Sequence, residues 1–328
     1  MTLTFGKILK PFFKLSVDAF PKMAAERYGQ NEDMDETWKQ FEPVARNLVG
    51  GFQTALDDDR FEVLVPLLNA VEGEFRGIAY EGAGMGLTLL DSLGPWKKRL
   101  KAFIAGPGAA YDWLLYIGAG LVLPRVPTPP ERFLAHLDPF LRWFVMDGYG
   151  FYEGFFSGRR SIDEHVVPAR ISGYARRAFD HGLGRSIWFS TGANVERIVT
   201  TISAFPETRQ ADLWGGIGLA CAYAAGVVDR EAITALRTAA GPYMPAMAAG
   251  AAVAAKFRMQ TGGVAAHTDL ACEVLCGLPS AIVAEIANLA CKDLPPDGVE
   301  PAYEIWRQRL AAQFSVLVES VSQHKEVM

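Results

Sequence analysis

Two short acidic motifs contain residues whose types and spacing could do chemistry. Tyr80-Glu81-Gly82 and Tyr152-Glu153-Gly154 each place a carboxylate beside a glycine, which lets a backbone or a ligand approach closely. Asp147 lies on the expected turn just before the second motif. Acids grouped in an apolar interior bind protons more tightly, so they could perform acid–base catalysis or hold a metal ion. In the alternative interpretation, each acid caps a helix or pairs with an arginine.

The segment 178–189, AFDHGLGRSIWF, has the densest set of functional side chains. His181 could transfer a proton near neutral pH, although a lone histidine is more often structural. Arg185 could bind a carboxylate or a phosphate through two hydrogen bonds. Gly182-Leu183-Gly184 lacks the third glycine and the preceding strand of a dinucleotide-binding motif, so a nucleotide cofactor is not indicated.

We expect the charged residues of these segments to meet in one buried cluster, because isolated buried charges are costly. Arg185 should neutralise one acid, and the acid that stays unpaired should have a raised pKa and be the best catalytic candidate. The candidate catalytic residues are Glu81, Asp147, Glu153, Asp180, His181 and Arg185.

Aromatic residues are dense between Trp143 and Phe156, too dense for one amphipathic stripe. Such a wall is usually core, but it can also line a long apolar tunnel for a polyene, acyl or isoprenoid ligand. We expect a cavity walled by Tyr149, Phe151, Phe155, Trp188 and Trp214, with Glu81, Glu153, Asp180 and Arg185 at one end. The candidate substrate-binding residues are Tyr80, Tyr149, Phe151, Tyr152, Phe155, Trp188, Trp214 and Tyr223.

Metal binding is only weakly indicated by the sequence. The five histidines are isolated, and no HExxH motif occurs. Asp58-Asp59-Arg60-Phe61-Glu62 spells the DDxxE pattern with which prenyl-diphosphate enzymes hold Mg²⁺, but no second magnesium motif follows. A Mg²⁺-dependent isoprenoid diphosphate enzyme using Asp58, Asp59 and Glu62 therefore stays an alternative to a solvated helix start. The sequence assigns no cofactor.

Composition restricts the class of protein and its partners. Half of the 328 residues are apolar and 21% are charged, which indicates a globular chain with a large core. The net charge of −5 argues against nucleic acid as a partner. Four cysteines without a CxxC pair indicate a reducing compartment, so we expect a cytoplasmic protein.

Helical spacing of apolar residues predicts one all-α domain over residues 1–328, with a helical body at 31–328. The longest uncharged runs, Leu213–Val228 and Ala239–Ala255, are shorter than the roughly 20 residues of a membrane span. Because both are rich in Gly and Ala, we expect them to be tightly packed central helices. The likeness of residues 76–82 to 148–154 suggests an internal duplication into two related units.

The first 30 residues form an amphipathic arm. Apolar residues from Phe5 to Phe20 fall on helical spacing, and Pro11 predicts that the helix begins near that position. We expect this helix to dock on the core; in the alternative, residues 5–20 contact a membrane surface.

Several longer strings together resemble the UnbL-like enediyne-biosynthesis family, domain-of-unknown-function family 1702. They are RGIAYEGAGM (76–85), DGYGFYEGFF (147–156), AFDHGLGRSIWF (178–189), AFPETRQADLWGGIGLACAYAAG (204–226), HTDLACEVLCG (267–277) and PAYEIWRQRL (301–310). Tyr152 stands where the family more often has His, and His181 where it more often has Gln. The second departure argues against a universal catalytic role for His181.

The resemblance implies a cytoplasmic accessory protein of bacterial natural-product pathways that start from a long conjugated polyene, without supplying a reaction. We therefore keep two hypotheses: an enzyme acting on a long apolar polyene-like substrate, a small hydrophobic molecule, by acid–base or metal-assisted chemistry, and a non-catalytic carrier of such a polyene or lipid. Partner biosynthetic enzymes and a homodimer are compatible with both.

Overall fold

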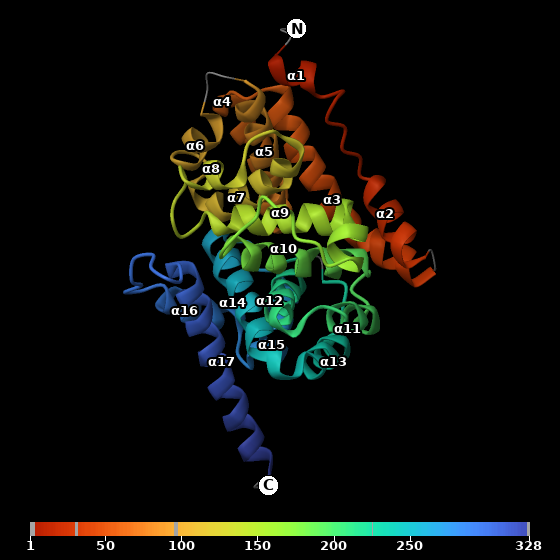
Figure 1. The fold of residues 1–328 in the computed structure, drawn as a ribbon, viewed down its shortest axis with the longest axis vertical. Coiled ribbons are helices and arrows are strands. Elements are labelled where there is room, and N and C mark those ends of the chain that lie inside the picture. Colours follow the sequence, from red (N-terminus) through yellow and green to blue (C-terminus); the bar gives the residue numbers. More distant parts are fainter. Residues whose placement is uncertain (1–3, 30–31, 95–97, 225, 327–328) are drawn as a thin grey trace.

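The computed structural model describes residues 4–29, 32–94, 98–224 and 226–326, so the first three residues and residue 30 of the expected arm lie outside it. Every regular element in these residues is a helix and none is a strand, which confirms the all-α prediction. The helices form one body from which the last helix projects (Figure 1).

The principal helices are α1 (Phe5–Leu9), α2 (Ala19–Tyr28), α3 (Glu32–Asp57), α4 (Phe61–Asn69), α5 (Gly73–Leu93), α6 (Arg99–Ile104), α7 (Asp112–Val122), α8 (Pro130–Leu134), α9 (Trp143–Phe156), α10 (Ala175–Ser190), α11 (Val195–Ser203), α12 (Glu207–Tyr223), α13 (Arg230–Ala240), α14 (Met244–Thr261), α15 (Ala266–Cys276), α16 (Ser280–Ala290) and α17 (Ala302–Glu326).

Seven of these helices form a series in which each packs on the next: α3, α5, α7, α9, α10, α12 and α14. In Figure 1, α9 and α10 lie across the middle of the molecule, between the half that contains α3, α5 and α7 and the half that contains α12 and α14. The centre of the protein is therefore the crossing of α9 and α10.

A Gly-x-Gly motif lies at these crossings in five consecutive helices of the series. The first glycine packs on a main-chain carbonyl of the preceding helix, and the second on a carbonyl of the following helix. A Cβ atom on Gly148, for example, would overlap the carbonyl oxygen of Ile117. Only glycine permits so close an approach of two backbones. The motifs begin at Gly82, Gly118, Gly148, Gly182 and Gly216.

The repeat differs from the two-unit duplication expected from the sequence. Gly148, Gly182, Gly216 and Gly250 follow one another at intervals of 34 residues, and each occupies the same place in its crossing. The structural counterpart of Gly82 is thus Gly148 and not Gly154. The Tyr-Glu-Gly likeness placed Glu81 opposite Glu153, whereas the helix crossings place it opposite Asp147.

Most of each Gly/Ala-rich run lies in a buried helix, as expected, but the second run is not one helix: it begins at the end of α13 and passes through the short 3-10 helix Gly241–Tyr243 before α14. Residues 212–223 of α12 and 247–255 of α14 are buried without interruption. The first run extends beyond the end of α12 at Tyr223, and its residue 225 lies outside the described residues. No single described helix is long and apolar enough to cross a membrane, and only α15 and α16 together, bent by 68°, pass such a test by length and composition.

The N-terminal arm differs from the helix expected to begin near Pro11. Two short helices, α1 and α2, are joined by the non-helical residues 10–18. Proline lacks an N–H and cannot continue the helical hydrogen bonds, so α1 ends at Leu9, although Lys10 still has helical backbone geometry. Part of the expected apolar stripe is exposed, Phe12 by 73%, whereas Phe20 of α2 is buried in the core.

Candidate functional site

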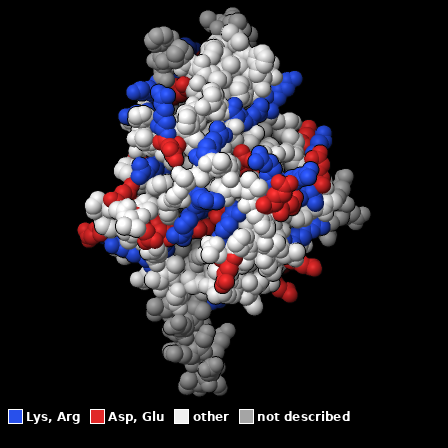
Figure 2. Space-filling model, viewed as in Figure 1, with Lys and Arg blue, Asp and Glu red and all other residues white. Residues whose placement is uncertain are grey.

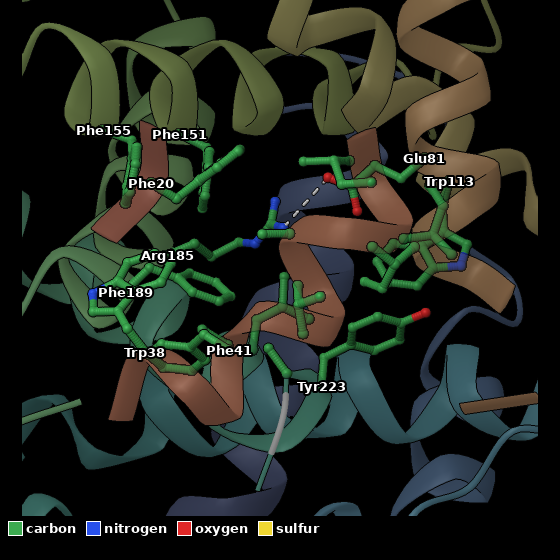
Figure 3. Close-up of a pocket in the computed structure, with 18 residues that line it drawn as sticks. Phe20, Trp38, Phe41, Glu81, Trp113, Phe151, Phe155, Arg185, Phe189 and Tyr223 are labelled. Carbon is green, nitrogen blue, oxygen red and sulfur yellow. Dashed lines mark ion pairs between the residues drawn. The ribbon is translucent and has the colours of Figure 1, made fainter. Parts of the chain in front are cut away.

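A cavity of about 40 Å³, the inner chamber, lies at the centre of the helix series. Its wall is almost entirely apolar and includes side chains from α2, α3, α5, α7, α9, α10 and α12 (Figure 3). Glu81 and Arg185 are its charged lining residues. The aromatic lining residues are Phe20, Trp38, Phe41, Trp113, Phe151, Phe155, Phe189 and Tyr223.

Glu81 and Arg185 extend toward each other across the inner chamber from opposite sides (Figure 3). Arg185 Nη2 lies 3.9 Å from Glu81 Oε1, within ion-pair range but beyond hydrogen-bond distance. The other terminal nitrogen, Nη1, donates a hydrogen bond to Asp147 Oδ1. One arginine thus serves two acids, and it bonds closely to only one of them.

Asp147 also bonds to His181. The Nδ1 atom of His181 lies 2.6 Å from Asp147 Oδ2, and both residues are buried. Because an ionised carboxylate accepts hydrogen bonds, the imidazole N–H at Nδ1 is the donor. We call Glu81, Asp147, His181 and Arg185 the site cluster.

The helix crossings explain why these side chains meet. Glu81, Asp147 and His181 each directly precede the first glycine of their helix's Gly-x-Gly motif. Since those glycines lie where two backbones touch, the preceding residue in each helix projects close to the common centre. The repeat therefore brings residues from α5, α9 and α10 together.

Burial and charge set different pKa values within the site cluster. The pKa of Glu81 is raised to about 7, mainly by burial; Arg185 opposes this rise, and the negative charge of Asp147 contributes to it. Burial would also raise the pKa of Asp147, but Arg185 and the hydrogen bond from His181 lower it overall. Burial lowers the pKa of His181 despite its bond to Asp147. Near neutral pH the cluster therefore contains one ionised acid, one arginine, a neutral histidine and a carboxyl that is about half ionised.

Two acids predicted to join this cluster lie elsewhere. Asp180 forms an ion pair with Arg209, whose Nε donates to it at 2.9 Å, and not with Arg185. Glu153 is half-buried on α9 and does not line the inner chamber. Successive residues of a helix point about 100° apart, so Asp180 faces away from the direction taken by His181. Glu153 and Asp180 were predicted to lie at the polar end of the cavity, and for these two residues the prediction is wrong.

The predicted aromatic residues divide between the cavity wall and the core. Phe151, Phe155 and Tyr223 line the inner chamber. Tyr80 instead stacks on Tyr111 with 3.9 Å between ring centroids. The expected wall residues Tyr149, Trp188 and Trp214 are buried but do not line the chamber; the Tyr149 hydroxyl accepts a hydrogen bond from Arg170 at 2.8 Å.

A second cavity of about 230 Å³, the outer chamber, lies next to the first under residues 13–23. The two chambers share Phe20, Leu48 and Phe151 as wall residues. Tyr152 lines the outer chamber, together with the basic residues Lys14 and Arg125. The two chambers are therefore neighbours separated by shared side chains, and Glu81 and Arg185 line the inner one.

Several residues that line the inner chamber were not predicted from the sequence. Phe20, Trp38 and Phe41 line the inner chamber from α2 and α3. Trp38 and Phe41 are three residues apart, so a helical reading of residues 32–57 could have placed them on one buried face. No local signal indicates that this face would meet Glu81.

A second charged cluster lies next to His181, and we call it the balanced cluster. Three of its four side chains are buried, whereas that of Arg177 is 40% exposed. Asp212 pairs with Arg177 at 2.9 Å and with Arg307 at 2.8 Å. Glu304 pairs with the same two arginines at 2.7 and 3.3 Å. None of these four residues lines either chamber. Asp212 and Arg307 lie in two of the sequence strings that carry the family resemblance, a signal that could have identified them.

The weak metal motif is engaged in ion pairs. Asp58 pairs with Arg60 at 2.6 Å, Asp59 pairs with Arg99, and α4 begins at Phe61. Glu62 is exposed in the first turn of that helix. Among the described residues, no group of three or more His, Cys, Asp or Glu side chains is placed to hold a metal ion.

Charged side chains of both signs are interspersed over the visible face of the molecule (Figure 2).

Comparison with known proteins gives a family but no activity. No curated protein and no solved structure matches the chain. One family model, described as "Protein of unknown function (DUF1702)", matches residues 11–314. The match includes the whole Gly-x-Gly helix series, the site cluster and both chambers. The protein therefore belongs to the DUF1702 family.

Proposed function

We propose that this protein is an enzyme that moves a proton on an elongated apolar substrate, with Glu81 as the acid–base group. One observation carries the proposal. Glu81 faces an aromatic-walled cavity, and its pKa of about 7 lies close to neutral pH. A general acid or base works best when its pKa is near the operating pH, and strongly shifted groups beside a cavity are characteristic of active sites.

The site cluster suits proton transfer on a conjugated carbonyl compound. The Glu81 carboxylate takes a proton from a saturated carbon next to the carbonyl or next to its conjugated double bonds, and the electron pair of that C–H bond moves through the π-system toward the oxygen. Arg185 stabilises the resulting oxyanion through Nη2. The protonated Glu81 then returns the proton to another carbon of the conjugated chain. The product is a double-bond isomer, and no further reactant is consumed.

The two chambers account for an elongated substrate. The inner chamber, at about 40 Å³, has room for a reacting end only. The rest of the molecule would lie in the outer chamber, which is about 230 Å³ and almost as apolar. Passage between the two requires displacement of Phe20, whose ring lies 5.4 Å from that of Phe155.

The sequence resemblance supports a biological setting for this activity. We propose that the protein acts in the cytoplasm on a long polyene of bacterial polyketide metabolism, as the resemblance to the enediyne-biosynthesis family implies. Partner biosynthetic enzymes would supply and remove the polyene. The conjugation of such a molecule fits the aromatic wall, because aromatic side chains pack well on flat π-systems.

The substitution Glu81→Gln tests the enzymatic proposal. We expect turnover of a conjugated polyene ketone, followed by its absorbance spectrum, to fall by about 10²–10⁴-fold. Binding, followed by quenching of fluorescence from Trp38 and Trp113, should remain. Glu285→Gln, the same chemical change on the exposed face of α16, serves as the control and should turn over substrate normally.

Full turnover by Glu81→Gln would contradict the proposal. Unchanged binding together with no turnover by the wild-type protein would instead support a carrier. The carrier remains the second candidate because the apolar chambers would shelter a reactive polyene without any use of Glu81.

A further inference from the structure

The charges around the inner chamber limit the kind of ligand that it can hold. Glu81 and Arg185 are the charged groups of its lining, and Asp147 lies directly behind Arg185. Because Arg185 donates a hydrogen bond to Asp147, its positive charge is already matched by a negative one. Glu81 adds either nothing or one further negative charge. The polar end of the chamber is therefore neutral or negative and has no spare cation.

Other nearby charged groups do not change this balance. His181 faces Asp147, and burial keeps its imidazole neutral. Arg258, from α14, packs over the Tyr223 ring at 4.0 Å and donates to main-chain carbonyls, but it does not line the chamber. Within the described residues, an anionic ligand end placed in the inner chamber would thus meet Glu81 without gaining an unpaired cation; Lys14 and Arg125 line only the outer chamber.

The separation of Glu81 and Arg185 suits an uncharged oxygen. Arg185 Nη2 and Glu81 Oε1 are 3.9 Å apart, too far for a hydrogen bond between them but close enough for an atom that bonds to both. A carbonyl oxygen can accept from Nη2 and from the protonated carboxyl, and a hydroxyl can also donate to the ionised one.

We infer that the substrate enters the inner chamber with an uncharged oxygen end, a carbonyl or a hydroxyl, and that Asp147 enforces this choice by cancelling the charge of Arg185. The inference rests on the proposed function, since it assumes that the ligand fills this chamber. A carboxylate or a phosphate would be a buried anion without a counter-charge, which is strongly unfavourable. Asp147 acts here as a positioning residue and does not touch the ligand.

Two ligands with the same conjugated tetraene chain test the inference, one ending in a methyl ketone and the other in a carboxylate. Binding is measured at pH 8 by tryptophan quenching. For the wild-type protein we expect the ketone to bind at least about tenfold more tightly than the carboxylate. In Asp147→Asn, where Arg185 keeps its charge, the preference should fall about tenfold or reverse.

A second variant avoids dependence on how well Asp147→Asn folds. Glu81→Gln removes the other negative charge and leaves the bond between Arg185 and Asp147 in place. At pH 8 it should bind the carboxylate more tightly than the wild-type protein does and bind the ketone about equally. Glu285→Gln should keep the wild-type preference.

The outcomes separate this inference from the proposed function. If the wild-type protein binds the carboxylate as tightly as the ketone, the charge argument is wrong and acid–base catalysis is unaffected. If neither ligand binds, the proposed substrate chamber is wrong and the inference fails with it. A carboxylate affinity that does not change in either variant would also overturn the role given to Asp147.

Discussion

The two charged clusters share helix α10 but differ in charge balance and in what they face. The balanced cluster matches two acids with two arginines, and each acid lies within 3.3 Å of both arginines. The site cluster has two acids and a single arginine, and its second acid is 3.9 Å from that arginine. Only the site cluster borders a chamber in the described residues.

The difference shows which buried charges are available for function. Burial would raise the pKa of Asp212, but its two arginines lower it overall, so this carboxylate stays ionised. Burial raises the pKa of Glu81 to about 7 because Arg185 is already bonded to Asp147. Under the proposed function, the surplus acid Glu81 beside a cavity is the group that transfers protons, whereas a matched acid such as Asp212 holds helices together.

The largest effect on stability should come from breaking the balanced cluster. Asp212→Asn would leave Arg177 and Arg307 short of a counter-charge, and loss of one partner of a buried ion pair typically costs about 3–5 kcal/mol. We expect a loss of this size in the free energy of unfolding at pH 7, measured by urea denaturation. The pKa of Asp212 is lowered in the folded protein, so its ion pairs stabilise the fold at neutral pH. This stabilisation is lost when acid protonates the carboxylate, as the pH falls through the folded-state pKa. A loss below about 1 kcal/mol would show that this cluster is not structural.

A comparable effect is expected at the crossing that assembles the site cluster. In Gly182→Ala, the added methyl group would overlap the carbonyl oxygen of Asp147 and force α9 and α10 apart. Overpacking of this kind costs about 1–3 kcal/mol or more, and we expect a value at the upper end together with loss of turnover. Gly50→Ala, at an exposed helical glycine of α3 with open space around it, should raise the melting temperature instead. Equal melting temperatures for the two variants would contradict the crossing geometry.

Removing Glu81, the acid of the site cluster without a close arginine, should stabilise the folded protein, whereas removing Asp212 should destabilise it. Because the folded state raises the pKa of Glu81 from 4.5 to about 7, its contribution is complete below pH 4.5 and is lost as the pH rises through 7. Glu81→Gln cannot ionise, so at pH 8 it should be more stable than the wild-type protein by at most about 3 kcal/mol. The gain should shrink to under about 1 kcal/mol at pH 5, as measured by chemical denaturation at both pH values. A destabilised variant at pH 8 would mean that Glu81 is well paired after all.

The smallest effect is expected for His181→Gln. The glutamine amide can donate to Asp147 as the imidazole does, so Arg185 should stay in place and turnover should change by less than about tenfold. His181→Leu, which removes the donor, should lower turnover much more. If His181→Gln abolishes turnover while its melting temperature is unchanged, His181 itself transfers protons and the site cluster has two acid–base groups.

The sequence by itself determined the fold class and the kind of chemistry to look for. Helical spacing without alternating strands predicts an all-α body, and the Gly/Ala composition predicts which helices are most buried; both follow from local patterns that folding cannot rearrange. Because isolated buried charges are costly, the sequence also predicted that Arg185 would neutralise one acid and that another acid would have a raised pKa. The structure identifies these acids as Asp147 and Glu81.

Only the tertiary structure decided which acids these would be. Helix periodicity says that Asp180 and His181 face different directions, but not that one meets Arg209 and the other meets Asp147, 34 residues earlier in the chain. That choice depends on the register of the glycine crossings, where whole backbones contact one another. The chamber likewise required Trp38 and Phe20 to arrive from the N-terminal helices. A helix sequence specifies its own faces, whereas the partner of each face is set by how all the helices pack together.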